Sequence, residues 1–240
     1  IFAGHGITAP EFGWDDYKGV DVRGKVLLLF TNEPASDDPK FFGGRALTYY
    51  GRWTYKYEEA ARRGAAAVLL IHTTPTAGYG WNVVRNSWSR EQPYVKLNPG
   101  EPALAFSGWV TSEAGARILA SAGRTVEELA KASELRTFRP MPLGLRFRGR
   151  IPSKIRQIES RNVVAILPGS DPAFSGEAVL FTAHWDHLGI GTPVNGDAIY
   201  NGAVDNASGC AILLEVARAW AALEQKPRRS AVFAAVTAEE

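Results

Sequence analysis

The stretch Ala178-Val179-Leu180-Phe181-Thr182-Ala183-His184-Trp185-Asp186-His187 joins a short apolar run directly to a polar cluster. The apolar part has the length and composition of a buried strand. The turn Pro168-Gly169-Ser170-Asp171-Pro172 separates it from a second apolar run at residues 162–167. In an open α/β sheet, ligands bind just beyond the carboxyl ends of strands. The stretch therefore predicts an α/β fold with chemistry-bearing side chains at the edge of its sheet.

Two further polar clusters lie at the ends of predicted elements. Residues 207–224 have the apolar spacing of a long helix, and Asp205-Asn206 immediately precede it. Residues 230–237 read as a buried strand, and Glu239-Glu240 follow it. We expect all three clusters to meet at one edge of the sheet.

The residue types in these clusters suit zinc. Zinc binds histidine nitrogen and carboxylate oxygen, and catalytic zinc sites keep one position open for water. In a His-x-Asp triplet on an extended segment, both side chains point the same way, so Asp186 can accept the second N–H of His184. Adjacent glutamates supply two roles, one as a metal ligand and one as the acceptor of a proton from water. Each cluster alone is unspecific, and Asp205 alone could be a helix cap.

Upstream of residue 150 the pattern changes to short elements joined by long polar loops. We predict strands at residues 26–30, 65–72, 102–106 and 143–148, helices at residues 55–63, 112–121 and 125–132, and a loop over residues 73–100. Thr125 and Glu128 have the spacing of a capping box. The domain boundary is expected near residue 150.

Composition excludes several classes of protein. The 240 residues are 45% hydrophobic, which is enough for a sizeable core. The net charge is +2 with acidic and basic residues mixed, so we predict no nucleic-acid partner. No apolar run reaches membrane-spanning length, so no membrane span is expected. Cys210 is the only cysteine, which excludes an intramolecular disulfide and a cysteine-based zinc site.

Three motifs make the C-terminal third recognisable. They are Thr182-Ala183-His184-Trp185-Asp186-His187-Leu188-Gly189, Tyr200-Asn201-Gly202-Ala203-Val204-Asp205-Asn206-Ala207-Ser208-Gly209 and Thr237-Ala238-Glu239-Glu240. Together they resemble the co-catalytic zinc aminopeptidases and their carboxypeptidase relatives, in particular members with an inserted protease-associated domain. Weaker motifs upstream resemble that domain: Gly4-His5-Gly6-Ile7, Gly24-Lys25-Val26 and residues 58–71.

The resemblance implies a role for each candidate site residue. His184 would bind the first of two zinc ions, Asp205 would bridge both, and Glu240 would bind the second. Glu239 would be the general base that activates the bridging water, and Asp186 would orient His184. His187 is expected to support the site or to line the rim of the substrate groove. Asn201 and Asn206 are expected to hold the loop around Asp205.

The resemblance also implies the architecture and the activity. Residues 1–150 would form a protease-associated domain, a β-rich α/β module, and residues 153–240 the N-terminal part of a zinc-peptidase α/β/α sandwich with a mixed sheet. The full protein would be an exopeptidase that removes residues from the N-terminus of a peptide or protein substrate. Alternatives are a carboxypeptidase or glutaminyl cyclase of the same fold, or a non-catalytic binding module based on the protease-associated domain. Receptor-like relatives that have lost the metal site are a further alternative, and the intact ligand set argues against it.

Two expectations concern the protein beyond this sequence. The family has one more Asp and one more His ligand after the glutamate pair, and the sequence ends at Glu240. We therefore expect residues 1–240 alone to be an inactive fragment that binds zinc weakly or not at all. The resemblance implies an extracytoplasmic location, secreted or periplasmic, whereas side-chain specificity and oligomeric state stay open.

Overall fold

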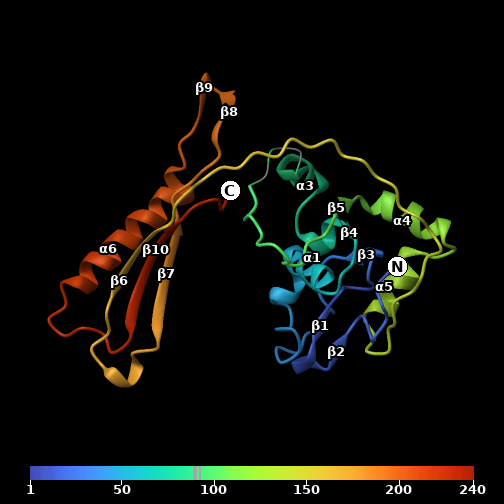
Figure 1. The fold of residues 1–240 in the computed structure, drawn as a ribbon, viewed down its shortest axis with the longest axis horizontal. Coiled ribbons are helices and arrows are strands. Elements are labelled where there is room, and N and C mark those ends of the chain that lie inside the picture. Colours follow the sequence, from blue (N-terminus) through green and yellow to red (C-terminus); the bar gives the residue numbers. More distant parts are fainter. Residues whose placement is uncertain (89–90, 92) are drawn as a thin grey trace. The chain divides into compact units, whose positions relative to one another are not determined.

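The computed structural model describes residues 1–88, 91 and 93–240, which fold as two compact units (Figure 1). The first unit spans Ile1–Ile151 and the second spans Pro152–Glu240. Both combine helices with strands, as the predicted α/β class requires. None of the described helices combines the length and the apolar character that a membrane crossing demands.

A parallel three-stranded sheet organises the first unit. Its order is β3-β4-β5, with bounds Val26–Phe30, Ala67–Ile71 and Phe106–Val110. Alternate side chains of β3 enter two separate cores, Leu27 and Leu29 on one face and Leu28 and Phe30 on the other. Burial on both faces explains why the sequence of this strand is apolar without interruption.

Helices cover both faces of this sheet. Helix α1 (Trp53–Arg62) packs Ala60 into one core, whereas α4 (Ser112–Ser121) and α5 (Val126–Ser133) pack Leu119 and Leu129 into the other. The remaining elements of the unit are β1 (Thr8–Ala9), β2 (Trp14–Asp15), α2 (Thr74–Ala77), α3 (Trp81–Trp88) and the 3₁₀ turns Pro10–Phe12 and Tyr49–Gly51.

Several sequence predictions for this unit are wrong. The segment expected to be a loop over residues 73–100 contains α2 and α3. The strand expected at residues 102–106 is β5, which only begins at Phe106, and residues 143–148 form no strand. Thr125 does cap α5 by accepting from the Glu128 amide, but the Glu128 carboxylate accepts from Arg124 instead of returning to the cap.

A fully buried lysine ties together two loops of the first unit. Nζ of Lys56 on α1 donates to the carbonyl oxygens of Asn32 at 2.6 Å and Tyr50 at 2.7 Å. Burial lowers the pKa of Lys56 to about 7, and the carboxylates of Asp16 and Glu33 oppose this shift. The folded chain therefore releases this proton far below the ordinary pKa of lysine.

We predict that Lys56 makes the free energy of unfolding rise with pH between about 7 and 10. In that window the unfolded chain binds one proton more than the folded chain, so stability increases by up to about 1.4 kcal/mol per pH unit. Urea unfolding of the wild type and of Lys56→Met at pH 7.5 and 9.5 measures this difference. Equal pH slopes for the two proteins would contradict it.

The second unit is built on a mixed sheet with the order β6-β10-β7, in which β10 is central. The strands span Val163–Leu167 (β6), Ser230–Val236 (β10) and Ala178–His184 (β7). β10 pairs antiparallel with β6 and parallel with β7. The sequence predicts all three strands to within one residue at each end.

Helix α6 (Gly209–Ala221) packs on this sheet through Leu213. Trp220 of the same helix meets Phe181 of β7 edge-on, and Phe181 stacks on Phe233 of β10. Other apolar side chains of β6 and β7 are exposed: Val163, Val164, Ile166, Val179 and Leu180. Full burial of these two strands, as the sequence suggests, is therefore not found in residues 1–240.

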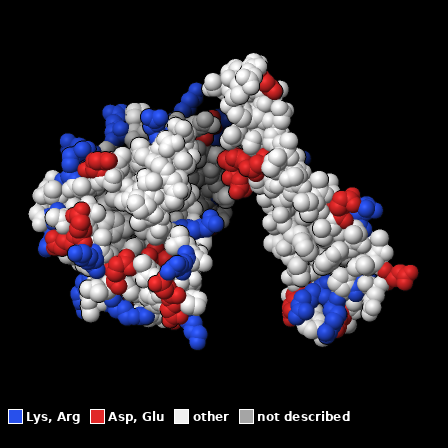
Figure 2. All heavy atoms as spheres, turned by 180° about the vertical axis from the view of Figure 1, so that it is seen from behind, with Lys and Arg blue, Asp and Glu red and all other residues white. Residues whose placement is uncertain are grey.

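The hairpin β8 (Gly189–Val194) and β9 (Asp197–Tyr200) links β7 to the segment before α6 and is not among the elements predicted from the sequence. A 3₁₀ turn also spans Pro172–Phe174. Figure 2 shows acidic and basic side chains interspersed on the visible face of the first unit, in keeping with the mixed charge pattern of the sequence.

Candidate metal centre

The parallel pairing of β7 with β10 brings two of the three polar clusters to one edge of the sheet. His184 ends β7 and lies opposite Val236, which ends β10. The Trp185 amide continues the pairing by donating to the Val236 carbonyl. Glu239 and Glu240 therefore follow β10 at the edge where His184 leaves β7.

Asp205 reaches the same place from the segment Ala203–Ser208, an irregular turn before α6 with a cis peptide bond between Asp205 and Asn206. Gly202 begins this turn in the left-handed region at φ 64°. The Asn206 side chain accepts from the Gly209 amide at the start of α6, and Asn201 donates to the Ile199 carbonyl two residues before it. Asn206 thus ties the loop around Asp205 to the helix, whereas the hydrogen bond of Asn201 stays within its own segment.

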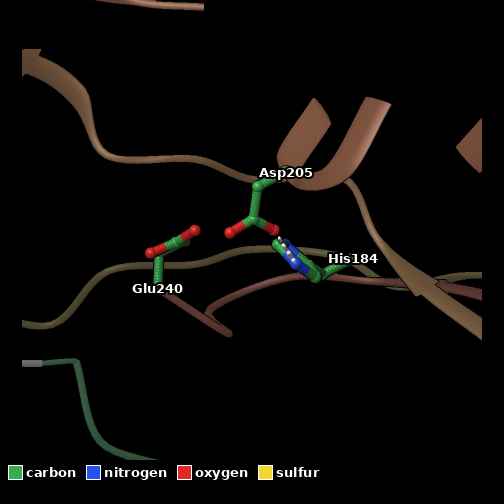
Figure 3. A group of neighbouring side chains, drawn as sticks. All are labelled: His184, Asp205 and Glu240. Carbon is green, nitrogen blue, oxygen red and sulfur yellow. Dashed lines mark ion pairs between the residues drawn. The ribbon is translucent and has the colours of Figure 1, made fainter. Parts of the chain in front are cut away.

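His184, Asp205 and Glu240 place their ligand atoms within 4.8 Å of one another. Nε2 of His184 lies 3.0 Å from Oδ1 of Asp205. Figure 3 shows the Asp205 carboxylate between the His184 ring and the Glu240 carboxylate. The predicted ligands of both proposed metals are therefore neighbours in space, although they are separated by up to 56 positions in the sequence.

The donor set fits zinc in type, and the spacing needs only a small adjustment. One imidazole nitrogen and two carboxylates are ordinary zinc ligands. Tetrahedral coordination at about 2.1 Å keeps donor atoms about 3.4 Å apart. The His184–Asp205 pair is already near that value, and the Asp205 side chain is 66% exposed, so its carboxylate has room to move.

Glu239 lies beside the same imidazole without being part of the ligand group. Its Oε2 is 3.8 Å from Nε2 of His184, and its side chain is 58% exposed. A carboxylate in this position is accessible to water and close to the metal ligands, which is the placement that a general base needs.

Asp186 is placed differently from the prediction. Nδ1 of His184 lies 3.1 Å from the backbone oxygen of Asp186 and 3.8 Å from its carboxylate oxygen Oδ1. The other carboxylate oxygen, Oδ2, accepts from the amides of Glu239 at 3.0 Å and Glu240 at 3.3 Å. Asp186 therefore orients His184 through its main chain, while its side chain holds the backbone of the glutamate pair.

The surroundings of His184 favour its protonated form when no cation is bound. Burial acts to lower the pKa of His184, but the hydrogen bond to the Asp186 carbonyl and the carboxylates of Glu239 and Asp205 together raise it above its ordinary value. The same negative charge that favours the proton also favours a metal ion in its place.

Two contacts at the site were not foreseen from the sequence. The thiol of Cys210 on α6 donates to the carbonyl of His184 at 3.2 Å and so joins the helix to the end of β7. His187 contacts Glu240, with 3.1 Å between Nδ1 and Oε1. Neither contact could be predicted from the spacing of residues in the sequence, because each joins two residues from separate elements.

The sequence of the second unit has a family match. Residues 162–240, about a third of the chain, match the model of Peptidase family M28. This matched stretch, the M28 segment, is similar to that peptidase family. All the candidate site residues lie within it, and it includes the mixed sheet and α6.

A solved structure of an aminopeptidase from Aneurinibacillus sp. strain AM-1 is similar to the chain at 18% identity and a TM-score of 0.34. The alignment covers 98% of this chain and 42% of that one, so the chain spans less than half the length of that aminopeptidase. None of the curated proteins matches the chain.

We predict that Asp186→Ala frees the backbone of the glutamate pair in the M28 segment. A hydrogen bond to a charged acceptor is worth about 1.5 kcal/mol or more, so exchange of the Glu239 and Glu240 amide protons should accelerate about tenfold. Asp186→Asn keeps an oxygen acceptor and is the matched control. Hydrogen exchange by NMR measures both; unchanged exchange in the alanine variant would contradict the assignment.

Proposed function

We propose that the protein containing this chain is a zinc-dependent exopeptidase, in the first instance an aminopeptidase. One observation carries the proposal: His184, Asp205 and Glu240 gather their ligand atoms within 4.8 Å at the sheet edge of an M28 peptidase segment. The substrate would be a peptide or protein with a free N-terminus.

The chain's own residues divide the chemistry between them. A bound zinc ion supplies a Lewis acid for the scissile carbonyl and makes water easier to deprotonate. Glu239, exposed and 3.8 Å from His184, accepts the proton from the attacking water and returns it to the leaving amine. Asp186 fixes the main chain of Glu239 and Glu240, so the base and the ligand keep their mutual position.

Three finer points belong to the same proposal. Two zinc ions would share Asp205, with His184 on one ion and Glu240 on the other. Residues 1–150 would be a protease-associated domain attached to the peptidase. The protein would act outside the cytoplasm. Each rests on the motif resemblance, and the 66% exposure of the Asp205 side chain is compatible with the bridging role.

We predict that Glu239→Gln in the full-length protein lowers kcat on aminoacyl-nitroanilides by about 10² to 10⁴, because a general base is lost. Zinc content by mass spectrometry should be unchanged, since Glu239 is not a proposed ligand. Glu224→Gln makes the same chemical change at an exposed position beyond α6 and should keep wild-type activity.

Chelation tests the metal requirement in the same assay. Activity should disappear in chelator and return with added zinc. Activity that resists chelator would exclude the zinc mechanism, whereas chelator-sensitive activity on C-terminally unblocked peptides or on N-terminal glutamine would favour the carboxypeptidase or cyclase alternatives.

Residues 1–240 alone are predicted to bind zinc weakly or not at all. Three ligands shared between two ions leave each proposed zinc with only two protein donors, Asp205 being common to both. Isothermal titration should show at most one weak site. Tight binding of two zinc ions per chain would refute this expectation.

A further inference from the structure

His187 contacts two segments that carry proposed metal ligands, the one with Glu240 and the one with Asp205. Its Nδ1 lies 3.1 Å from Oε1 of Glu240, and both side chains are largely shielded, with 23% and 21% exposed. The residue belongs to the polar segment after β7, whereas Glu240 follows β10. The contact is therefore a bridge between two separate parts of the site.

The second contact is with the backbone that carries Asp205. A Cβ atom added at Gly202 would lie 2.9 Å from Cβ and from Cγ of His187, and also 2.9 Å from the Asp205 carbonyl oxygen. Gly202 has φ 64°, a conformation in which side chains are strained. The main chain at Gly202 thus lies directly against His187, and only glycine allows this approach.

The chemistry of the two groups fixes which one donates the hydrogen bond between His187 and Glu240. An ionised carboxylate only accepts hydrogen bonds, so Nδ1 of His187 must carry the hydrogen. One oxygen of Glu240 is then fixed by His187, and the other is left for a metal ion.

We propose that His187 is a positioning residue for the metal centre: it orients the Glu240 carboxylate and sets its distance from the Asp205 loop. This inference rests on the proposed function, because it assigns a role to a neighbour of the proposed ligands. Groups that hold a metal ligand by a hydrogen bond typically change metal affinity 10- to 100-fold when they are removed.

The hydrogen bond is tested first without metal. Long-range ¹⁵N–¹H spectra of the histidine rings in residues 1–240 report which ring nitrogen carries the hydrogen. We expect the Nδ1–H form for His187 in the wild type, and its loss in Glu240→Ala. An Nε2–H form in the wild type, or a spectrum that Glu240→Ala does not change, would overturn the proposal.

The role in metal binding is tested by zinc titration of the full-length protein, followed through the His184 ring resonances up to several millimolar zinc. We expect His187→Ala to raise the dissociation constant about tenfold or more. His187→Asn can place an amide N–H near the position of Nδ1 and should stay within about threefold of wild type. Equal affinities for wild type and His187→Ala would overturn the proposal.

One control variant and one outcome of the titration separate this inference from the proposed function. His72→Gln changes a histidine of the first unit, whose Nε2 contacts the Tyr79 carbonyl, and should leave zinc binding unchanged. In the full-length protein, a wild-type His184 signal that zinc never shifts would refute the metal centre and with it the ligand role of Glu240. The metal-free spectra would still decide whether His187 holds Glu240.

Discussion

The parallel pairing of β7 with β10 is the constraint on which the candidate site depends. Because His184 pairs with Val236, both strands end at the same level of the sheet. The polar residues that follow the two strands therefore lie at the same edge of the sheet. The packing of α6 against these strands, through Leu213 and the ring pair Phe181 and Phe233, keeps Asp205 at the start of the helix within reach of that edge.

Four carboxylates gathered at one edge repel one another, and neighbouring donors offset part of this repulsion. Asp186 accepts from two backbone amides, and Glu240 contacts His187. Asp205 and Glu239 both face the ring of His184, at 3.0 and 3.8 Å. One imidazole between two carboxylates is an incomplete compensation of charge, which is why the site favours a proton on His184 or a cation in its place. The negative charge of the site and the spacing of its donor atoms thus both favour the binding of a cation.

The first unit shows where pattern reading succeeds and where it fails. The bounds of β3 and α4 were predictable to the residue. An apolar run bounded by turn residues is typical of a buried strand, and apolar residues at helical spacing after a capping residue are typical of a helix. Helix α3 was missed because its aromatic side chains read as loop residues; Trp88 instead packs edge-on against Trp53. The strand expected at residues 102–106 was displaced, since its position is set by pairing with β4, which lies far away in the sequence.

The sequence by itself determined the class of fold, the strands β6, β7 and β10, and the identity of the candidate ligands His184, Asp205 and Glu240. The strands could be predicted because they are continuous apolar runs, whereas the candidate ligands are what the resemblance of the motifs at the element ends implies. Only the tertiary structure decided which groups support them. The side chain of Asp186 holds the glutamate backbone, Cys210 contacts the His184 carbonyl, and His187 lies between Glu240 and Gly202. Such contacts join atoms from different elements, and the distance between those atoms is fixed by strand register and loop packing, which no local pattern encodes.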